Sequence, residues 1–286
     1  MPANESFLDI IQEHLRSNEI LLPVFDRPAP DIRNRILADS PDLEDIERLI
    51  LRDPAFTFHV LKAANSAFFK GLTKVTTIKN AIIRLGTGEI ARIISELTTP
   101  ENLQVHDPFS MRIMKPLWLH ATVCAVGTRW VAEQCRFESL LDESFIAGQL
   151  HDIGKLLLIA VVEHLGHSDM PHLRPSDTLL TEVMKNFHAE HGFLFMEKWG
   201  LPEYYSNIAR SHHFEDADPN NTLQLMVRLV NKACNKLGIG INKDSSIILA
   251  ATQEASMLGL SEIFLAKLEI MIEDALPSER PGEPAP

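Results

Sequence analysis

One short stretch of this chain, Leu150–Lys155, places an imidazole directly before a carboxylate, as His151 and Asp152. Further histidines lie in or at the end of separate segments with helix-like apolar patterns: His120, His188, His212 and His213. Neutral imidazole nitrogens and carboxylate oxygens are ligands that Fe, Mn and Zn accept. An aspartate is almost never fully buried unless it is paired or bound to a cation. The pattern therefore predicts a metal site built on a helical bundle.

The alternative interpretation is structural. A single histidine on an apolar helix face is usually a core residue with one hydrogen bond, and this holds for any one of these histidines taken alone. This structural interpretation explains less well why four such segments occur together and why an aspartate adjoins one of the histidines. The remaining histidines stand in polar loops or isolated helix positions and receive no role. His191, three positions after His188, is also left out of the predicted site.

The composition excludes one functional class. Hydrophobic residues make up 45% of the 286 positions and charged residues 23%, values typical of a globular protein that buries a full core. The net charge of −12 argues against general binding to the nucleic-acid backbone, which needs clustered lysine and arginine. A small nucleotide at a local basic or metal site remains compatible with this charge.

The hydropathy pattern predicts a cytoplasmic protein that does not enter a membrane. Charged residues interrupt the stretch Ser6–Leu22, so we expect no secretory signal there. The longest nearly uncharged run, Leu156–Val162, is too short to span a bilayer. Cys124, Cys135 and Cys234 are far apart, and we interpret them as buried free thiols in a reducing compartment.

Helical periodicity, without a convincing run of period-two alternation, predicts an all-α protein. Asp53–Pro54 and Thr77 are helix-start signals in the N-terminal half, and Gly86 is a stop signal. The polar stretch Thr99–Ser110 holds two prolines and is the best internal boundary. The predicted organisation is an N-terminal helical subdomain in residues 1–105, a second helical bundle in residues 106–276 on which it packs, and a disordered tail in residues 277–286.

Further patterns place the candidate ligands on helices. Apolar positions three and four apart predict a long helix from about Pro116 to Cys135, with His120 on its buried face. A helix from about Asp177 is expected to end near Asn186, so that His188 begins the next one. Pro202 starts a short helix that ends at the two adjacent histidines.

The chain also resembles a known family. A lone histidine, a His-Asp pair, a further histidine and a His-His pair follow one another as in the HD superfamily of metal-dependent phosphohydrolases, particularly its HD-GYP branch. Several segments narrow the resemblance to the HDOD domain, an HD-related output module of bacterial signalling. These segments are Leu22–Pro23, Ile50–Ala55, Ala63–Ala67, Val75–Ile82, Leu85–Gly86 and Trp199–Pro202. The resemblance runs from about residue 18 to residue 240 and implies an HD-like helical bundle in the second half.

The resemblance implies two metal positions that share one carboxylate. The implied ligands are His120 and His151 for the first position, Asp152 as the bridge, and His188, His212 and His213 for the second. Lys155, one turn after His151, is implied to contact a substrate phosphate. Its positive charge suits that role, and a carboxylate between two cations is a plausible bridge.

The sequence departs from the resembled enzymes in two places. Asn231 stands where a closing aspartate is expected, and the segment Phe214–Asp218 lacks the Gly-Tyr-Pro signature linked with cyclic dinucleotide hydrolysis. A carboxamide lacks the negative charge of a carboxylate, and metal affinity depends strongly on ligand charge. We therefore expect at most one tightly held divalent ion (Fe, Mn or Zn) per chain, at the second position.

Two hypotheses of different class follow. The first is a bacterial signal-transduction regulatory module with a partly retained metal site, whose partners are signalling proteins and, as a further candidate, a small phosphorylated ligand. The second is a metal-dependent phosphohydrolase acting on a nucleotide or other phosphoester, with Asp152 and Lys155 as catalytic residues. The N-terminal segments and Asn231 favour the first hypothesis, and the retained histidines favour the second.

Overall fold

The computed structural model describes residues 20–25, 29–36, 41–69, 71–99, 108–167 and 175–276, together with Asp9, Ile11, Glu13 and Ala38. Every regular element among these residues is a helix, so the all-α prediction is confirmed. The elements are α2 (Ala29–Ile36), α3 (Leu43–Ile50), α4 (Pro54–Ala64), α5 (Ile78–Leu97), α6 (Pro108–Gln134), η1 (Glu138–Leu140), α7 (Leu141–Leu150), α8 (Ile153–His167), α9 (Asp177–Lys198), α10 (Glu203–Ser211), α11 (Thr222–Leu237), η3 (Leu249–Ala251), α12 (Gln253–Met257) and α13 (Glu262–Asp274).

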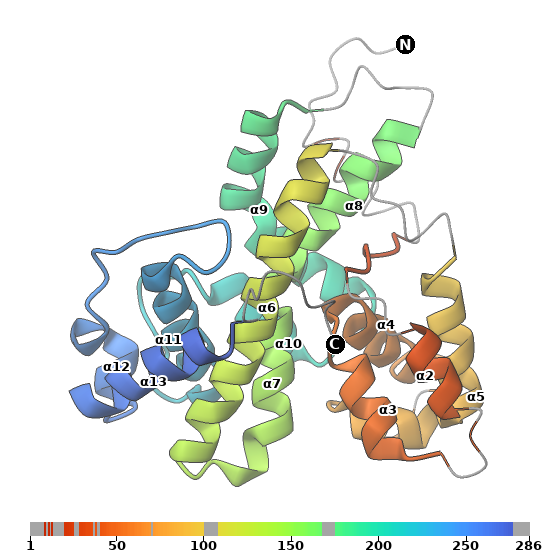
Figure 1. The fold of residues 1–286 in the computed structure, drawn as a ribbon, viewed down its shortest axis with the longest axis horizontal. Coiled ribbons are helices and arrows are strands. Elements are labelled where there is room, and N and C mark those ends of the chain that lie inside the picture. The colour runs from red at the N-terminus through yellow and green to blue at the C-terminus, as the bar shows by residue number, and fades with distance from the viewer. Residues whose placement is uncertain are drawn as a thin grey trace, which may run out of the picture.

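The helices form an N-terminal group that packs on one side of a larger bundle (Figure 1). Helices α2 to α5 lie together on that side, and α4 contacts α6 and α7. Helices α6 and α7 pack along each other through the middle of the molecule, and α11 to α13 lie on the far side of α6. The predicted packing of an N-terminal helical part on a second helical bundle is therefore confirmed.

The start and stop signals of the N-terminal half act as predicted. Asp53 caps α4, because its side chain accepts a hydrogen bond from the backbone N–H of Ala55. Thr77 caps α5 by accepting from the N–H of Asn80. Gly86 breaks the helical path inside α5 with a φ of 75°, a left-handed conformation that glycine adopts without steric cost.

Polar contacts join the two halves. The Lys74 ammonium donates a hydrogen bond to the carbonyl of Leu201 at 2.7 Å. The Tyr205 hydroxyl, on α10, donates to the carbonyl of Thr76 at 2.7 Å. Both acceptors are backbone carbonyls outside the helices, so the contacts link segment 74–76 directly to the start of α10.

Two helices differ from the predicted bounds. Helix α6 begins at Pro108 and continues through Pro116, because the missing N–H of a proline costs one backbone hydrogen bond without stopping a helix that is packed on its neighbours. Helix α9 is continuous, so the predicted break near Asn186 is wrong. The Asn186 side chain donates to the carbonyl of Glu182 one turn earlier, and His188 lies in the middle of the helix.

The predicted domain boundary and tail remain predictions, because residues 100–107 and 277–286 lie outside the described residues. One described stretch, residues 138–164, is long and apolar enough by length and composition to cross a membrane. It is longer than the apolar run considered in the sequence because it joins α7 and α8 across the His-Asp turn. Its apolar window is 94% buried inside the protein, as in a core helix.

Two glycines let α8 approach α9 closely. A Cβ on Gly154 would overlap the backbone carbonyl of His188, and a Cβ on Gly192 would lie 3.1 Å from the backbone N of Gly154. Any larger residue at position 154 would push the two backbones apart. Gly154 therefore determines how near His188 comes to the His-Asp turn.

We expect Gly154→Ala to lower the free energy of unfolding by about 1–3 kcal/mol or more, because the added methyl group meets backbone that cannot move independently. Gly88→Ala is the matched control, since the Cβ there would meet nothing within 4 Å. The control should leave stability unchanged or raise it by about 0.5–1 kcal/mol. Urea unfolding of the two variants measures this, and equal effects would contradict the close α8–α9 contact.

Candidate metal centre

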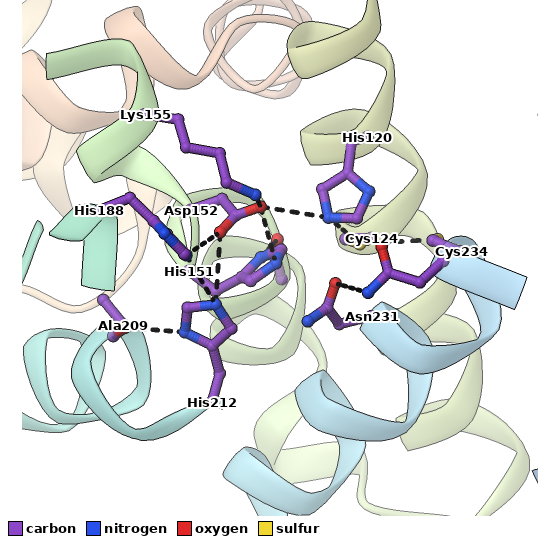
Figure 2. Close-up of polar contacts among 12 residues, drawn as sticks. His120, Cys124, His151, Asp152, Lys155, His188, Ala209, His212, Asn231 and Cys234 are labelled. Atoms are coloured by element: carbon purple, nitrogen blue, oxygen red, sulfur yellow. Dashed lines mark hydrogen bonds and ion pairs between the residues drawn. The ribbon is translucent and has the colours of Figure 1, made fainter. Parts of the chain in front are cut away.

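The six predicted metal ligands and Lys155 meet at one point between the helices (Figure 2). Helix α6 supplies His120, and the turn between α7 and α8 supplies His151 and Asp152. The first turn of α8 supplies Lys155 and the middle of α9 supplies His188. The end of α10 supplies the adjacent pair His212 and His213.

The two carboxylate oxygens of Asp152 face different histidines. Oδ1 lies 3.0 Å from His188 Nε2 and 3.3 Å from His212 Nε2. Oδ2 lies 3.3 Å from His120 Nε2 and 3.5 Å from His151 Nε2. His212, His188 and Asp152 also group with His213, whose Nε2 is 3.2 Å from that of His188. This division has the form of a carboxylate between two ligand groups.

The histidine rings are held in one orientation by backbone carbonyls. A carbonyl oxygen only accepts, so each ring nitrogen Nδ1 that contacts one carries the hydrogen and donates it. In the neutral ring the opposite nitrogen, Nε2, then presents a lone pair. The four pairs are His120 with Ile239 at 2.9 Å, His151 with Gly148 at 2.7 Å, His188 with Met184 at 2.6 Å, and His212 with Ala209 at 2.7 Å.

Several lone pairs consequently face one another without a hydrogen between them. His188 Nε2 and His212 Nε2 are 3.3 Å apart, and both rings donate through the other nitrogen. His151 Nε2 and Asp152 Oδ1 are buried atoms with no hydrogen-bond partner in the described part of the chain. Buried acceptors left unpaired cost free energy. A cation among them removes that cost, and the donor set therefore fits a divalent metal.

Burial keeps three of the rings neutral. It lowers the pKa of His151 to about 3, where the Asp152 charge only partly opposes it. It also lowers the pKa of His213 to about 4 and that of His212 well below its usual value. Neutral imidazole is the form that binds metals, so protons do not compete for these three ligands near pH 7.

Asp152 is ionised despite its burial. Burial alone would raise the pKa of this carboxyl, but Lys155 and the facing histidines outweigh it and hold the pKa well below its usual range. Lys155 Nζ lies 2.5 Å from Oδ2. Burial alone would lower the pKa of His120. The hydrogen bond to Asp152 and the charge of that carboxylate outweigh burial, so the pKa of His120 is raised above its usual value. A proton on His120 Nε2 thus competes with a metal there.

Asn231, which stands in place of the expected aspartate, is buried on α11 near the site. Its side-chain oxygen accepts a hydrogen bond from Asn235 at 3.4 Å. A neutral amide at this place gives the site no negative charge from α11. His191, which the sequence analysis left out, is in none of the groups of candidate metal ligands among the described residues, and within that part of the chain neither of its ring nitrogens has a hydrogen-bond partner.

Two cysteines that the sequence analysis interpreted as buried free thiols, without a role in the site, lie against it. Cys124 Sγ is 3.6 Å from His120 Nε2 and 3.6 Å from Cys234 Sγ. The available signal was spacing, because Cys124 follows His120 by four positions on α6 and Cys234 follows Asn231 by three on α11. Residues at these spacings share a helix face.

Most of the chain matches a known protein family. The family model for the HDOD domain matches residues 22–214. An uncharacterized protein from Treponema pallidum (strain Nichols) is 29% identical over 186 residues, which are 61% of this chain and 34% of that protein. The chain therefore spans about a third of the length of this curated relative.

Solved structures share the fold. The MmoQ response regulator from Methylococcus capsulatus (strain Bath) superposes with a TM-score of 0.66 at 19% identity, covering 88% of this chain and 98% of that one. A virulence factor from Campylobacter jejuni superposes with a TM-score of 0.63 at 17% identity, covering 95% and 99% of the two chains. At these identities the likeness shows the fold alone.

The low pKa of His151 predicts how stability depends on pH. The unfolded chain binds a proton there below about pH 6.5, whereas the folded chain does not until about pH 3. Stability from this residue is therefore complete above pH 6.5 and is lost as the pH falls towards 3.

With metal removed by a chelator, we expect the wild type to lose about 2 kcal/mol more unfolding free energy than His151→Gln between pH 7 and pH 5. Urea unfolding at the two pH values measures this difference. Only the change with pH counts, so a difference in overall stability between the two proteins does not affect the comparison. An equal loss in both proteins would show that His151 is not kept neutral by burial.

Proposed function

The chain belongs to the HDOD domain family, and we propose that it is a regulatory module of bacterial signal transduction whose folded state holds one divalent ion. The ion, Fe, Mn or Zn, would be bound by Asp152, His188, His212 and His213. A bound divalent ion supplies positive charge to a buried carboxylate and to facing imidazole lone pairs. The proposal includes a cytoplasmic location and signalling proteins as partners.

The observation that carries the proposal is the burial of the site. Asp152 is 7% exposed, Lys155 is 4% exposed and His212 is 3% exposed. An ion needs only the space between its ligands, whereas a phosphoester substrate needs an open approach to the metal. Of the four candidate ligand residues, His213 is the exposed one, although its ring nitrogen Nε2 faces that of the buried His188. This arrangement suits an ion that stabilises a conformation.

Helix α10 offers a physical route from the ion to the N-terminal half. Its last turn leads into His212 and His213, and its first turn carries Tyr205, which holds the Thr76 carbonyl. Metal binding that orders the end of α10 would thus also favour the position of segment 74–76. The contact of Lys74 with Leu201, just before α10, supports the same route.

The wider signalling role draws on the comparisons. A response regulator shares the fold, which favours regulation over independent catalysis. Lys155, a basic side chain beside the candidate metal ligands, is paired with Asp152. A small phosphorylated ligand near that lysine remains part of the proposal, and it would have to compete with this ion pair.

The second candidate is a metal-dependent phosphohydrolase. Its specific support is the convergence of His120, His151 and Asp152 as a second ligand group beside Lys155. Here Asp152 and Lys155 would be the catalytic residues, as the family resemblance implies. A screen of nitrophenyl phosphate mono- and diesters with Mn²⁺ or Fe²⁺ added decides between the two, because turnover that disappears in Asp152→Asn would favour the enzyme.

We expect one Mn²⁺ per chain after loading and gel filtration of the wild type, measured by elemental analysis. His213→Ala should reduce this to near zero, because three ligands remain and one is the shared carboxylate. Asn231→Asp should raise the Mn²⁺ content towards two, because it restores a negative charge beside the first position.

The matched control is His191→Gln, which changes a buried histidine on the helix of His188 without touching a ligand group. It should keep the full Mn²⁺ content. Two tightly held Mn²⁺ ions per wild-type chain would contradict the asymmetry between the positions. Unchanged content in His213→Ala would contradict the ligand set.

Hydrogen exchange should reveal the route through α10. We expect Mn²⁺ to slow amide exchange both around residues 203–213 and in residues 75–82 of the wild type. In Tyr205→Phe the slowing near the metal should persist, while that in residues 75–82 should diminish, because the bond to the Thr76 carbonyl is gone. Slowing confined to the metal ligands in the wild type would refute the coupling.

A further inference from the structure

A sulfur-containing cluster lies beside the nitrogen and oxygen ligands. His120 Nε2, Cys124 Sγ and Cys234 Sγ all lie within 4.8 Å of one another. Both cysteines have no exposed surface, and His120 is 4% exposed. The side chains come from α6 and α11, which pack directly against each other. Figure 2 shows His120 and Cys234 approaching Cys124 from these two helices.

The distances suit a tetrahedral metal position. With Zn–S bonds of about 2.3 Å and Zn–N bonds of about 2.05 Å, two sulfurs on one zinc lie about 3.8 Å apart, and a sulfur and a nitrogen about 3.6 Å apart. The sulfur atoms of Cys124 and Cys234 are 3.6 Å apart, and Cys124 Sγ is 3.6 Å from His120 Nε2. Both distances from Cys124 Sγ therefore match those between ligands of one ion, and His120 Nε2 and Cys234 Sγ lie within 4.8 Å of each other.

The backbone after α11 aims the histidine at the sulfurs. The carbonyl of Ile239 accepts from His120 Nδ1, which leaves Nε2 directed towards Cys124. Gly240 has a φ of 115°, and a Cβ there would lie 3.1 Å from the His120 ring. Only glycine reaches this conformation easily and leaves space for the ring. Helix α11 thus contributes both a ligand and, just beyond its end, the carbonyl that orients another.

We propose that His120, Cys124 and Cys234 form an additional metal position, distinct from the two implied by the family resemblance and selective for a thiophilic ion such as Zn²⁺. Thiolates favour zinc over hard ions such as Mn²⁺. Binding releases the two thiol protons to solvent and forms two metal–sulfur bonds, with no change of oxidation state. The two thiolate charges balance the dication. Asp152 Oδ2 lies 3.3 Å from His120 Nε2, so this position borders the buried carboxylate.

This position is independent of the ion described under the proposed function. It shares none of the four ligands Asp152, His188, His212 and His213. It does use His120, so an ion on the sulfurs takes the nitrogen that the family resemblance assigns to the first position. Asn231 lacks the negative charge of the expected aspartate. In a metal-bound site the thiolate of Cys234, about one turn further along α11, supplies a negative charge instead.

Cobalt(II) tests the proposal, because a cobalt–thiolate bond gives an intense near-ultraviolet charge-transfer absorption that nitrogen and oxygen ligands do not give. Reduced wild-type protein, kept anaerobic with a phosphine reductant, should develop this absorption on titration with Co²⁺. Zinc should then displace it. The absorption should disappear in Cys124→Ser and in Cys234→Ser. Cys135→Ser is the matched control, a half-buried free thiol at the end of α6, and should keep it.

Further measurements separate this proposal from the first one. His213→Ala should lose Mn²⁺ and keep the cobalt–thiolate absorption, whereas Cys234→Ser should keep Mn²⁺ and lose the absorption. Wild-type protein loaded with Zn²⁺ should hold two ions per chain and show sulfur ligands in X-ray absorption, a result that needs no variant to fold. Wild-type protein with no cobalt–thiolate absorption and no zinc–sulfur bonds would overturn the proposal, as would loss of the absorption in Cys135→Ser alone.

Discussion

The Asp152 carboxylate is ionised although only 7% of the residue is exposed. Moving an ionised carboxylate out of water costs several kcal/mol unless donors and cations compensate. Lys155 supplies one positive charge at Oδ2, but Oδ1 faces only imidazole nitrogens and has no hydrogen-bond donor among the described residues. The packing of α6 to α10 around this point is therefore most favourable when a cation completes it.

Helix ends do much of the positioning. The last carbonyls of a helix have no partner within it, and two of the rings use such carbonyls. His151 donates to Gly148 at the end of α7, and His212 donates to Ala209 at the end of α10. A histidine placed just after a helix thus satisfies a free carbonyl and fixes its own tautomer with the same bond. This is why a turn between helices can hold a well-oriented ligand.

The convergence of the candidate ligand residues could be predicted from sequence because each stands in a motif with its own local signal. The course of the helices that carry these residues and the contacts between those helices could not be predicted in the same way. The sequence analysis divided α9 near Asn186, since an asparagine resembles a helix end when its side-chain bond to Glu182 is unknown. The contact between Cys124 and Cys234 joins residues 110 positions apart and depends on how α6 crosses α11. Spacing shows which residues share a helix face, but the partner of that face is decided by tertiary packing.

The sulfur cluster changes the meaning of the neutral residue at position 231. An asparagine there, judged alone, indicates a site that has lost affinity. A thiolate at position 234 returns a negative charge to the same face of α11, three residues on, where it meets Cys124 and His120. The charge is similar but the ligand is softer, so the consequence is a change in which ion is preferred. Two neighbouring positions of different softness, on either side of one buried carboxylate, would let the fold respond separately to two kinds of metal.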